Sequence, residues 1–195
     1  MHGLAVALLW AAIPGKWQRN SAEVEHFASD LIEFSTRLPY WLTLGSIRRG
    51  WARSASGDTA KGLSWIEDGI RTHRASGAIM GMPYFLGLKA EALYFADRTR
   101  EALEAIEEAE SLADRYEQRN GCAELRRLRG VFLAASGAEE NQIEASFCEA
   151  IRIAKEQKSV SLQKRAPRKP VQNITSKKRA GQEDVDSDSL SANRL

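Results

Sequence analysis

The chain has few of the residues that build disulfide frameworks or metal sites. It contains two cysteines, Cys122 and Cys148, in 195 residues. Two are too few for a disulfide scaffold, and neither forms a Cys-x-x-Cys pair or lies at zinc-ligand spacing from a histidine. The histidines His2, His26 and His73 are isolated from one another. We therefore expect no metal, no cofactor and a reducing, cytoplasmic location.

No apolar run is long enough to cross a bilayer. The opening stretch from Leu4 to Ile13 is apolar, but no positive charge precedes it and no small-x-small cleavage site follows it. We expect it to form the first buried helix of the fold, with no membrane association.

Net charge is small and unevenly distributed. Of the 28 basic and 26 acidic residues, residues 159–195 hold eight basic and four acidic ones, which leaves 20 against 22 in residues 1–158. Residues 1–158, with a net charge near −2, lack the positive surface that neutralises phosphates. This argues against a nucleic-acid-binding domain. The basic tail leaves weak contact with nucleic acid as an alternative.

Catalytic motifs are missing as well. Gly57 and Gly62 have the spacing of a phosphate-binding loop, but Leu63 and Ser64 follow where Lys and Ser/Thr are required. No serine lies in a nucleophile-elbow context. The acidic run from Glu101 to Glu110 has the helical spacing of a solvated face. We predict that the chain is not an enzyme.

A repeat dominates what the sequence does contain. A stripe of three residues with internal spacing of four and then three recurs at steps of about 40 residues. Small residues on either side of a large one let a neighbouring helix approach closely. The four copies are Val24/Ala28/Leu31, Gly62/Ile66/Gly69, Ala102/Ile106/Ala109 and Ile143/Phe147/Ala150.

Each stripe predicts the second helix of a hairpin, because another helical run precedes it. These first helices are expected at 4–12, 40–55, 84–96 and 123–135, and breakers separate them from the second helices at Pro14-Gly15, Ser56-Gly57-Asp58, Asp97-Arg98-Thr99 and Ser136-Gly137. Ser21, Asp58 and Thr99 are the expected N-caps, and Gly77 and Gly137 the expected helix stops. No alternating run indicates a strand.

The helical pattern stops near residue 158. After it come Pro167 and Pro170, a basic stretch and an acidic one, a composition that cannot bury enough apolar surface to offset chain entropy. We predict an all-α, right-handed solenoid of about four antiparallel hairpins over residues 1–158 and a disordered tail over residues 159–195.

The repeats resemble tetratricopeptide repeats, although their period is longer than usual and the closing proline is missing. More specifically, YWLTLGSIRRGWARSASGD, GMPYFLGLKAEALYFADRTREALEAIEEA, AELRRLRGVFLAASG and IEASFCEAIRIAKEQKSVSL resemble the C-terminal helical repeats of bacterial multidomain adenylate/guanylate cyclase–ATPase regulators. The resemblance covers residues 3–165. It implies a repeat region without the cyclase or the ATPase, and no catalytic residue is carried over.

A solenoid of hairpins has a concave groove lined by the first helix of each pair. Aromatic and arginine side chains there can anchor a peptide or a partner helix. The repeat register predicts that the groove is lined by Trp51, Tyr84, Glu91, Tyr94 and Arg127. The alternative is that Trp51 and the tyrosines pack between hairpins.

We expect a non-catalytic scaffold that presents this groove to a protein or peptide, or to a second copy of the chain, within a signalling or transcriptional regulator. The alternative is a truncated gene fragment of a cyclase–ATPase regulator with no independent function, whose exposed ends would favour self-association.

Overall fold

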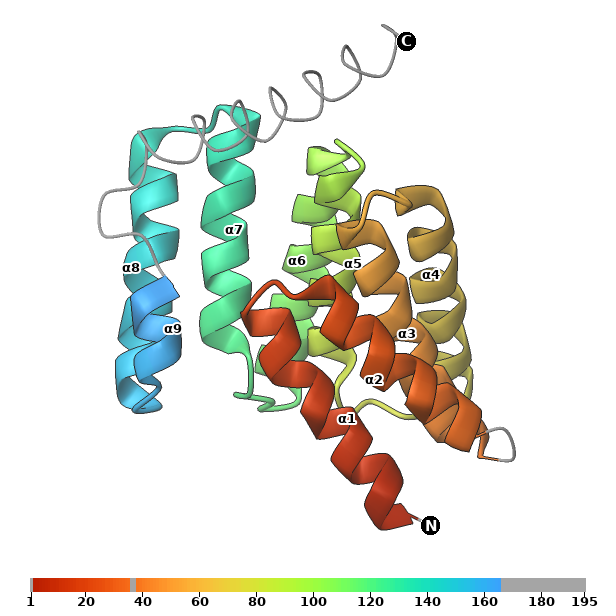
Figure 1. The fold of residues 1–195 in the computed structure, drawn as a ribbon. Helices are drawn as coiled ribbons and strands as arrows, with labels where there is room; N and C mark the ends of the chain where they lie inside the picture. Colours follow the sequence, from red (N-terminus) through yellow and green to blue (C-terminus); the bar gives the residue numbers. More distant parts are fainter. Residues whose placement is uncertain (1, 36–37, 166–195) are drawn as a thin grey trace, which may run out of the picture. The chain divides into compact units, whose positions relative to one another are not determined.

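The computed structural model describes residues 2–35 and 38–165 (Figure 1). These residues form helices joined by short turns, and no strand occurs among them. They fall into two compact units, which divide between Gly121 and Cys122. The helices are α1 (His2–Trp17), α2 (Ser21–Phe34), α3 (Pro39–Ala55), α4 (Thr59–Ala75), α5 (Met82–Phe95), α6 (Thr99–Arg115), α7 (Cys122–Ser136), α8 (Glu140–Glu156) and α9 (Val160–Arg165).

The first unit consists of three helical hairpins, α1–α2, α3–α4 and α5–α6, which succeed one another in Figure 1. The two helices of each hairpin pack together, and α2 contacts α3 while α4 contacts α5. The first helices also meet, because α3 contacts both α1 and α5. This is the predicted all-α, tetratricopeptide-like hairpin architecture.

The recurring stripe forms the contact between helices, as the sequence predicted. All twelve of its residues are buried in the second helices α2, α4, α6 and α8. Leu31, Ile66 and Ile106 are fully inaccessible, and Phe147 is 2% exposed. The large residues of the stripes therefore fill the space between helices, while small ones such as Gly62 and Gly69 let neighbouring helices approach closely.

Glycines mark the closest approach, between α3 and α4. A Cβ added to Gly62 would lie 2.4 Å from the carbonyl oxygen of Gly50 and 2.8 Å from the backbone nitrogen of Ser54. Real Cβ atoms do not come this near to backbone atoms. The small stripe position at residue 62 therefore allows two helix backbones to touch.

Two predicted boundaries of the first hairpin are wrong. Pro14 and Gly15 do not break the chain but lie inside α1. The last turn of α1 is held by tertiary contacts, since Val24 Cγ2 would lie 3.1 Å from a Cβ added to Gly15 and Lys16 pairs with Glu91. The N-cap of α2 is Asn20 rather than Ser21, and its side chain accepts a hydrogen bond from the Glu23 backbone at 3.1 Å.

The other predicted caps are mostly correct. Asp58 caps α4 by accepting from the backbone N–H of Lys61, and Gly77 and Gly137 have the positive φ of helix-terminating glycines. Thr99 is not a cap but the first residue of α6, and Arg98 occupies the N-cap position without a side-chain bond to the helix.

The second unit contains the hairpin α7–α8 and the short helix α9, which contacts α8. Helix α9 lies within the predicted tail and forms because Leu162, 8% exposed, packs with Ala123 and Ala154. The rest of the predicted tail, residues 166–195, lies outside the described residues. None of the described helices combines the length and the apolar character that spanning a membrane requires.

Candidate partner-binding surface

Side chains from α1, α3 and α5 meet on one face of the first unit, which we call the first-helix face. It comprises Lys16, Arg48, Trp51, Tyr84 and Glu91, which contact one another across these helices. These residues come from the first helix of each of three successive hairpins, so the face crosses every hairpin of this unit.

A buried carboxylate lies at the centre of this face. Glu91 is 3% exposed and accepts a hydrogen bond from the indole Nε1 of Trp51 at 3.0 Å. The same oxygen, Oε2, lies 3.0 Å from Nζ of Lys16, which is 4% exposed. One carboxylate thus links the three first helices. Charge-assisted bonds of this kind are short and roughly twice as strong as neutral ones.

Arg19 adds a longer contact from the end of α1. Its Nη2 lies 3.8 Å from Oε1 of Glu91, and the side chain is 56% exposed. Since a solvated cation at this distance contributes little, the buried Lys16 is the main counter-charge of Glu91.

Arg48, the neighbour of this network on α3, is buried in a different way. It is 5% exposed, and its guanidinium carbon lies 5.3 Å from the ring centre of Tyr84 and 5.8 Å from that of Phe85. Its Nη1 donates to the carbonyl of Leu44, one turn back, at 3.1 Å. Burial lowers the pKa of the Arg48 guanidinium, and the nearby Tyr84 and Tyr40 partly oppose that change.

No protein family model matches the chain. An uncharacterized protein of Rhizobium meliloti (strain 1021) is 28% identical over 117 residues, which are 60% of this chain and 11% of that protein. The chain thus spans about a tenth of the relative's length. The solved structure of Bacillus thuringiensis PlcR in complex with the peptide PapR7 and DNA superposes with a TM-score of 0.53, 15% sequence identity and coverage of 79% of this chain and 70% of that one. The likeness shows a tetratricopeptide-like helical fold.

Four of the five predicted groove residues, Trp51, Tyr84, Glu91 and Tyr94, belong to the first unit, and Arg127 belongs to the second. Trp51 and Glu91 are buried and bonded to each other, whereas Tyr84 and Tyr94 are half-buried on α5. The burial of Trp51 corresponds to the packing alternative, with the indole beneath the surface. Positions 84, 91 and 94 share one side of α5 because they are separated by seven and three residues.

Arg127 belongs to the second unit. It is 6% exposed, and its Nε and Nη2 donate to the two carboxylate oxygens of Glu124, each at 2.9 Å. Arg165 of α9 approaches the same carboxylate at 3.1 Å. The bidentate pair lies within α7, and it is the Arg165 contact that joins α9 to α7. A role of Arg127 in partner binding stays a prediction.

Sequence reasoning missed Lys16 and Arg48. Lys16 follows Pro14-Gly15, which we interpreted as a turn, so no buried role was expected for it. Arg48 lies one turn before Trp51 on the same side of α3, and this spacing is a signal that could have placed it on the first-helix face.

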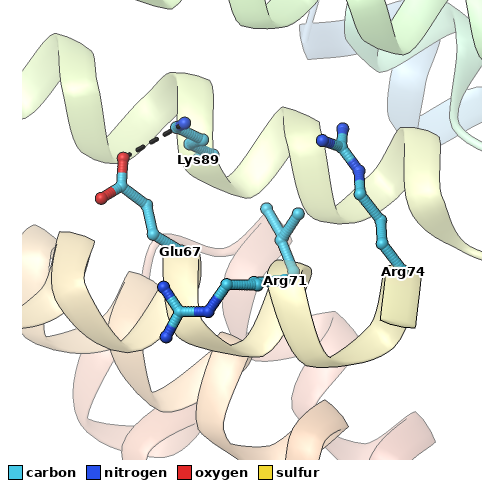
Figure 2. A pocket seen from close by; sticks show the side chains of 5 residues that line it. Glu67, Arg71, Arg74 and Lys89 are labelled. Carbon is cyan, nitrogen blue, oxygen red and sulfur yellow. Dashed lines mark ion pairs between the residues drawn. The ribbon is translucent and has the colours of Figure 1, made fainter. Parts of the chain in front are cut away.

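An open depression of about 240 Å³ lies between α4 and α5 (Figure 2). It is lined by Glu67, Ile70, Arg71, Arg74 and Lys89. Each cation already has a carboxylate: Lys89 pairs with Glu67 at 3.1 Å, Arg71 with Asp68 at 2.6 Å and Arg74 with Glu108. Small-molecule sites are usually larger than this, and the charged side chains that line the depression are already paired with one another or with neighbours.

Within residues 2–35 and 38–165, no cluster of three or more His, Cys, Asp or Glu side chains is placed to hold a metal ion. Cys148 is exposed and Cys122 half-buried, both as free thiols. The first-helix face is therefore the candidate site in the described part of the chain, and its arrangement suits recognition of a partner by contact.

Proposed function

We propose that the chain is a non-catalytic interaction module that binds a protein or peptide along the first-helix face. The observation that carries this proposal is the bonding of Trp51 and Lys16 to the buried Glu91. It fixes three successive first helices relative to one another, and a preorganised surface loses less entropy on binding. The aromatic anchors are the half-buried Tyr84 of this face and Tyr94, which lies beside the face on the same side of α5.

The solved PlcR structure supports the same kind of function. That protein has a similar fold and is bound to a peptide and DNA. For this chain we propose the peptide or protein partner, in a cytoplasmic signalling or regulatory system. Contact with nucleic acid is proposed only as a weak property of the basic tail.

The Rhizobium meliloti relative supports a connection with larger proteins, since the match occupies 11% of its length. The helical-repeat region of a cyclase–ATPase regulator is our finer proposal, carried by the sequence resemblance alone. An isolated fragment without its own function is the alternative, and it predicts that the chain binds no peptide.

A peptide-display experiment tests the proposal. A random dodecapeptide library is panned against the full chain, and the dissociation constant of an enriched peptide is measured by calorimetry. We expect Tyr84→Ala and Tyr94→Ala each to weaken binding about tenfold or more, because aromatic anchors contribute roughly 2 kcal/mol at such surfaces.

Tyr116→Ala is the matched control, because Tyr116 is 39% exposed and lies at the C-cap of α6, which is the second helix of its hairpin. It should leave the dissociation constant unchanged. A failure to enrich any peptide, or an equal loss in the control, would count against a first-helix binding surface.

A further inference from the structure

Arg48 is a buried cation whose positive charge is not neutralised by the fold. Among the residues that the structure describes, no carboxylate pairs with it, and its Nε has no acceptor. Buried arginines are nearly always paired. This guanidinium has one backbone carbonyl and two ring faces as partners.

Those partners do not offset the burial. The free energy needed to remove a cation from water exceeds the stabilisation that contact with an aromatic ring provides. A single neutral acceptor also leaves most of the five N–H donors of the guanidinium without a protein acceptor. The contrast within this chain is clear, because Lys16 and Arg127, buried to a similar degree, each have a carboxylate at 3.0 Å or less.

The surroundings of Arg48 indicate what kind of anion fits. The hydroxyls of Tyr40 and Tyr84 have no hydrogen-bond partner within the described residues, and both groups are electrostatic neighbours of the guanidinium. The Tyr84 ring centre lies 5.3 Å from the guanidinium carbon, and Tyr40 is a further electrostatic neighbour, so a single negative charge near Arg48 has two hydroxyl donors available in its surroundings. A carboxylate also matches the planar guanidinium better than a phosphate dianion, which usually takes more than one cation.

Exposed apolar side chains gather beside this group. Tyr40 is 45% exposed, and its ring lies 5.9 Å from that of the buried His73. The Nε2 atom of His73 contacts the carbonyl oxygen of Met80 at 3.1 Å, and Met80 is 78% exposed. His73 also packs against Phe85, which lies beside Arg48. The exposed Tyr40 is thus linked to Arg48 through the rings of His73 and Phe85, and the backbone of the exposed Met80 contacts the same histidine.

We propose that Arg48, Tyr40 and Tyr84 bind a carboxylate of the partner peptide, next to an apolar side chain of that peptide that packs on Tyr40 and Met80. The inference rests on the proposed function and names the chemistry that the partner must present. The carboxylate is supplied either by the C-terminus of the peptide or by an Asp or Glu side chain.

Small probes separate these possibilities in the full-length chain. N-acetyl-leucine carries a C-terminal carboxylate, the α-amide of N-acetyl-glutamic acid carries a side-chain carboxylate, and N-acetyl-leucinamide carries neither. The readout is the NMR cross-peak of the Arg48 Nε–H group, assigned by its loss in Arg48→Met. We expect a saturable shift with at least one carboxylate and none with the neutral amide.

Stability distinguishes binding from a structural role. Arg48→Met removes the unpaired charge and keeps an unbranched apolar stem, so the melting temperature should stay the same or rise while carboxylate binding, followed through the Tyr84 ring signals, falls at least about tenfold. Tyr84→Phe keeps the ring and removes only the hydroxyl, and it should weaken binding without lowering the melting temperature. Arg71→Met is the matched control, because Arg71 is 76% exposed and pairs with Asp68.

Three results would overturn the inference: no saturable shift with either carboxylate, an equal response to N-acetyl-leucinamide or inorganic phosphate, or a fall in melting temperature for Arg48→Met. The display peptides separate this failure from a failure of the proposed function. If the binding of these peptides depended on Tyr94 but not on Arg48, the interaction surface would be supported and the carboxylate site would be ruled out.

Discussion

Replacing Glu91 by alanine should lower the free energy of unfolding of the first unit by about 3–5 kcal/mol, because it leaves a buried cation without its counter-charge. Lys16 would remain 4% exposed with its nearest carboxylate removed, and the indole N–H of Trp51 would lose its acceptor. Domains of ordinary stability have a free energy of unfolding of about 5–15 kcal/mol. The variant would therefore lose a large part of the total.

Tryptophan fluorescence in urea measures this effect in the relevant unit. All five tryptophans precede residue 66, so their signal reports on residues 1–121 and not on the second unit. The midpoint and slope of the transition together give the change in free energy.

A paired replacement tests the electrostatic cause. Glu91→Leu together with Lys16→Met removes both charges and keeps apolar volume, so the double variant should recover at least about 2 kcal/mol relative to Glu91→Leu alone. Trp51 would still lack an acceptor, which keeps the recovery incomplete.

Glu104→Ala is the control for an exposed pair. Glu104 is 61% exposed and lies 3.2 Å from Arg100, so its loss should cost less than about 1 kcal/mol. If Glu91→Ala behaved like this control, the buried network would not hold the first helices together.

The helical pairs could be predicted because their determinants repeat. Apolar residues return at the same spacing in each copy, and small ones such as Gly62 and Ala102 occupy the same place in the second and third copies. A glycine that touches another backbone has no substitute at that distance. The cap at Asp58 could be predicted for the same local reason, since its side chain bonds three residues away.

The first-helix face depends on contacts that no local pattern contains. Trp51 and Glu91 are 40 residues apart, and Lys16 is still more distant from Glu91 in the chain. The low helix propensity of proline predicts a helix break at Pro14. Helix α1 nevertheless continues through Pro14, and this continuation places Lys16 next to Glu91. Tertiary pairing overrides the local signal here, which is why the same surface was predicted with Trp51 as a contact residue and without Lys16.

The backbone contact between α3 and α4 leads to the second large effect. Gly62→Ala should lower the free energy of unfolding by about 3 kcal/mol, at the upper end for a single overpacked methyl group. The added Cβ would lie 2.4 Å from the carbonyl oxygen of Gly50 and 2.1 Å from Oγ of Ser54. The hydroxyl could rotate away, but the carbonyl belongs to a helix and can move only if α3 and α4 separate.

Two other glycines make the test quantitative. At Gly69 the added Cβ would lie 2.4 Å from Cγ1 of Ile47, a side-chain atom, whereas at Gly3 nothing lies within 4 Å. Gly69→Ala should therefore cost less than Gly62→Ala, since a side chain adjusts more easily than a backbone. Gly3→Ala should be neutral or stabilising by less than about 1 kcal/mol, because residue 3 lies in the first turn of α1, where nothing crowds the methyl group and alanine has the higher helix propensity. Tryptophan fluorescence in urea would rank the three variants. A Gly62→Ala protein as stable as the parent would mean that the α3 and α4 backbones are not in contact at this position.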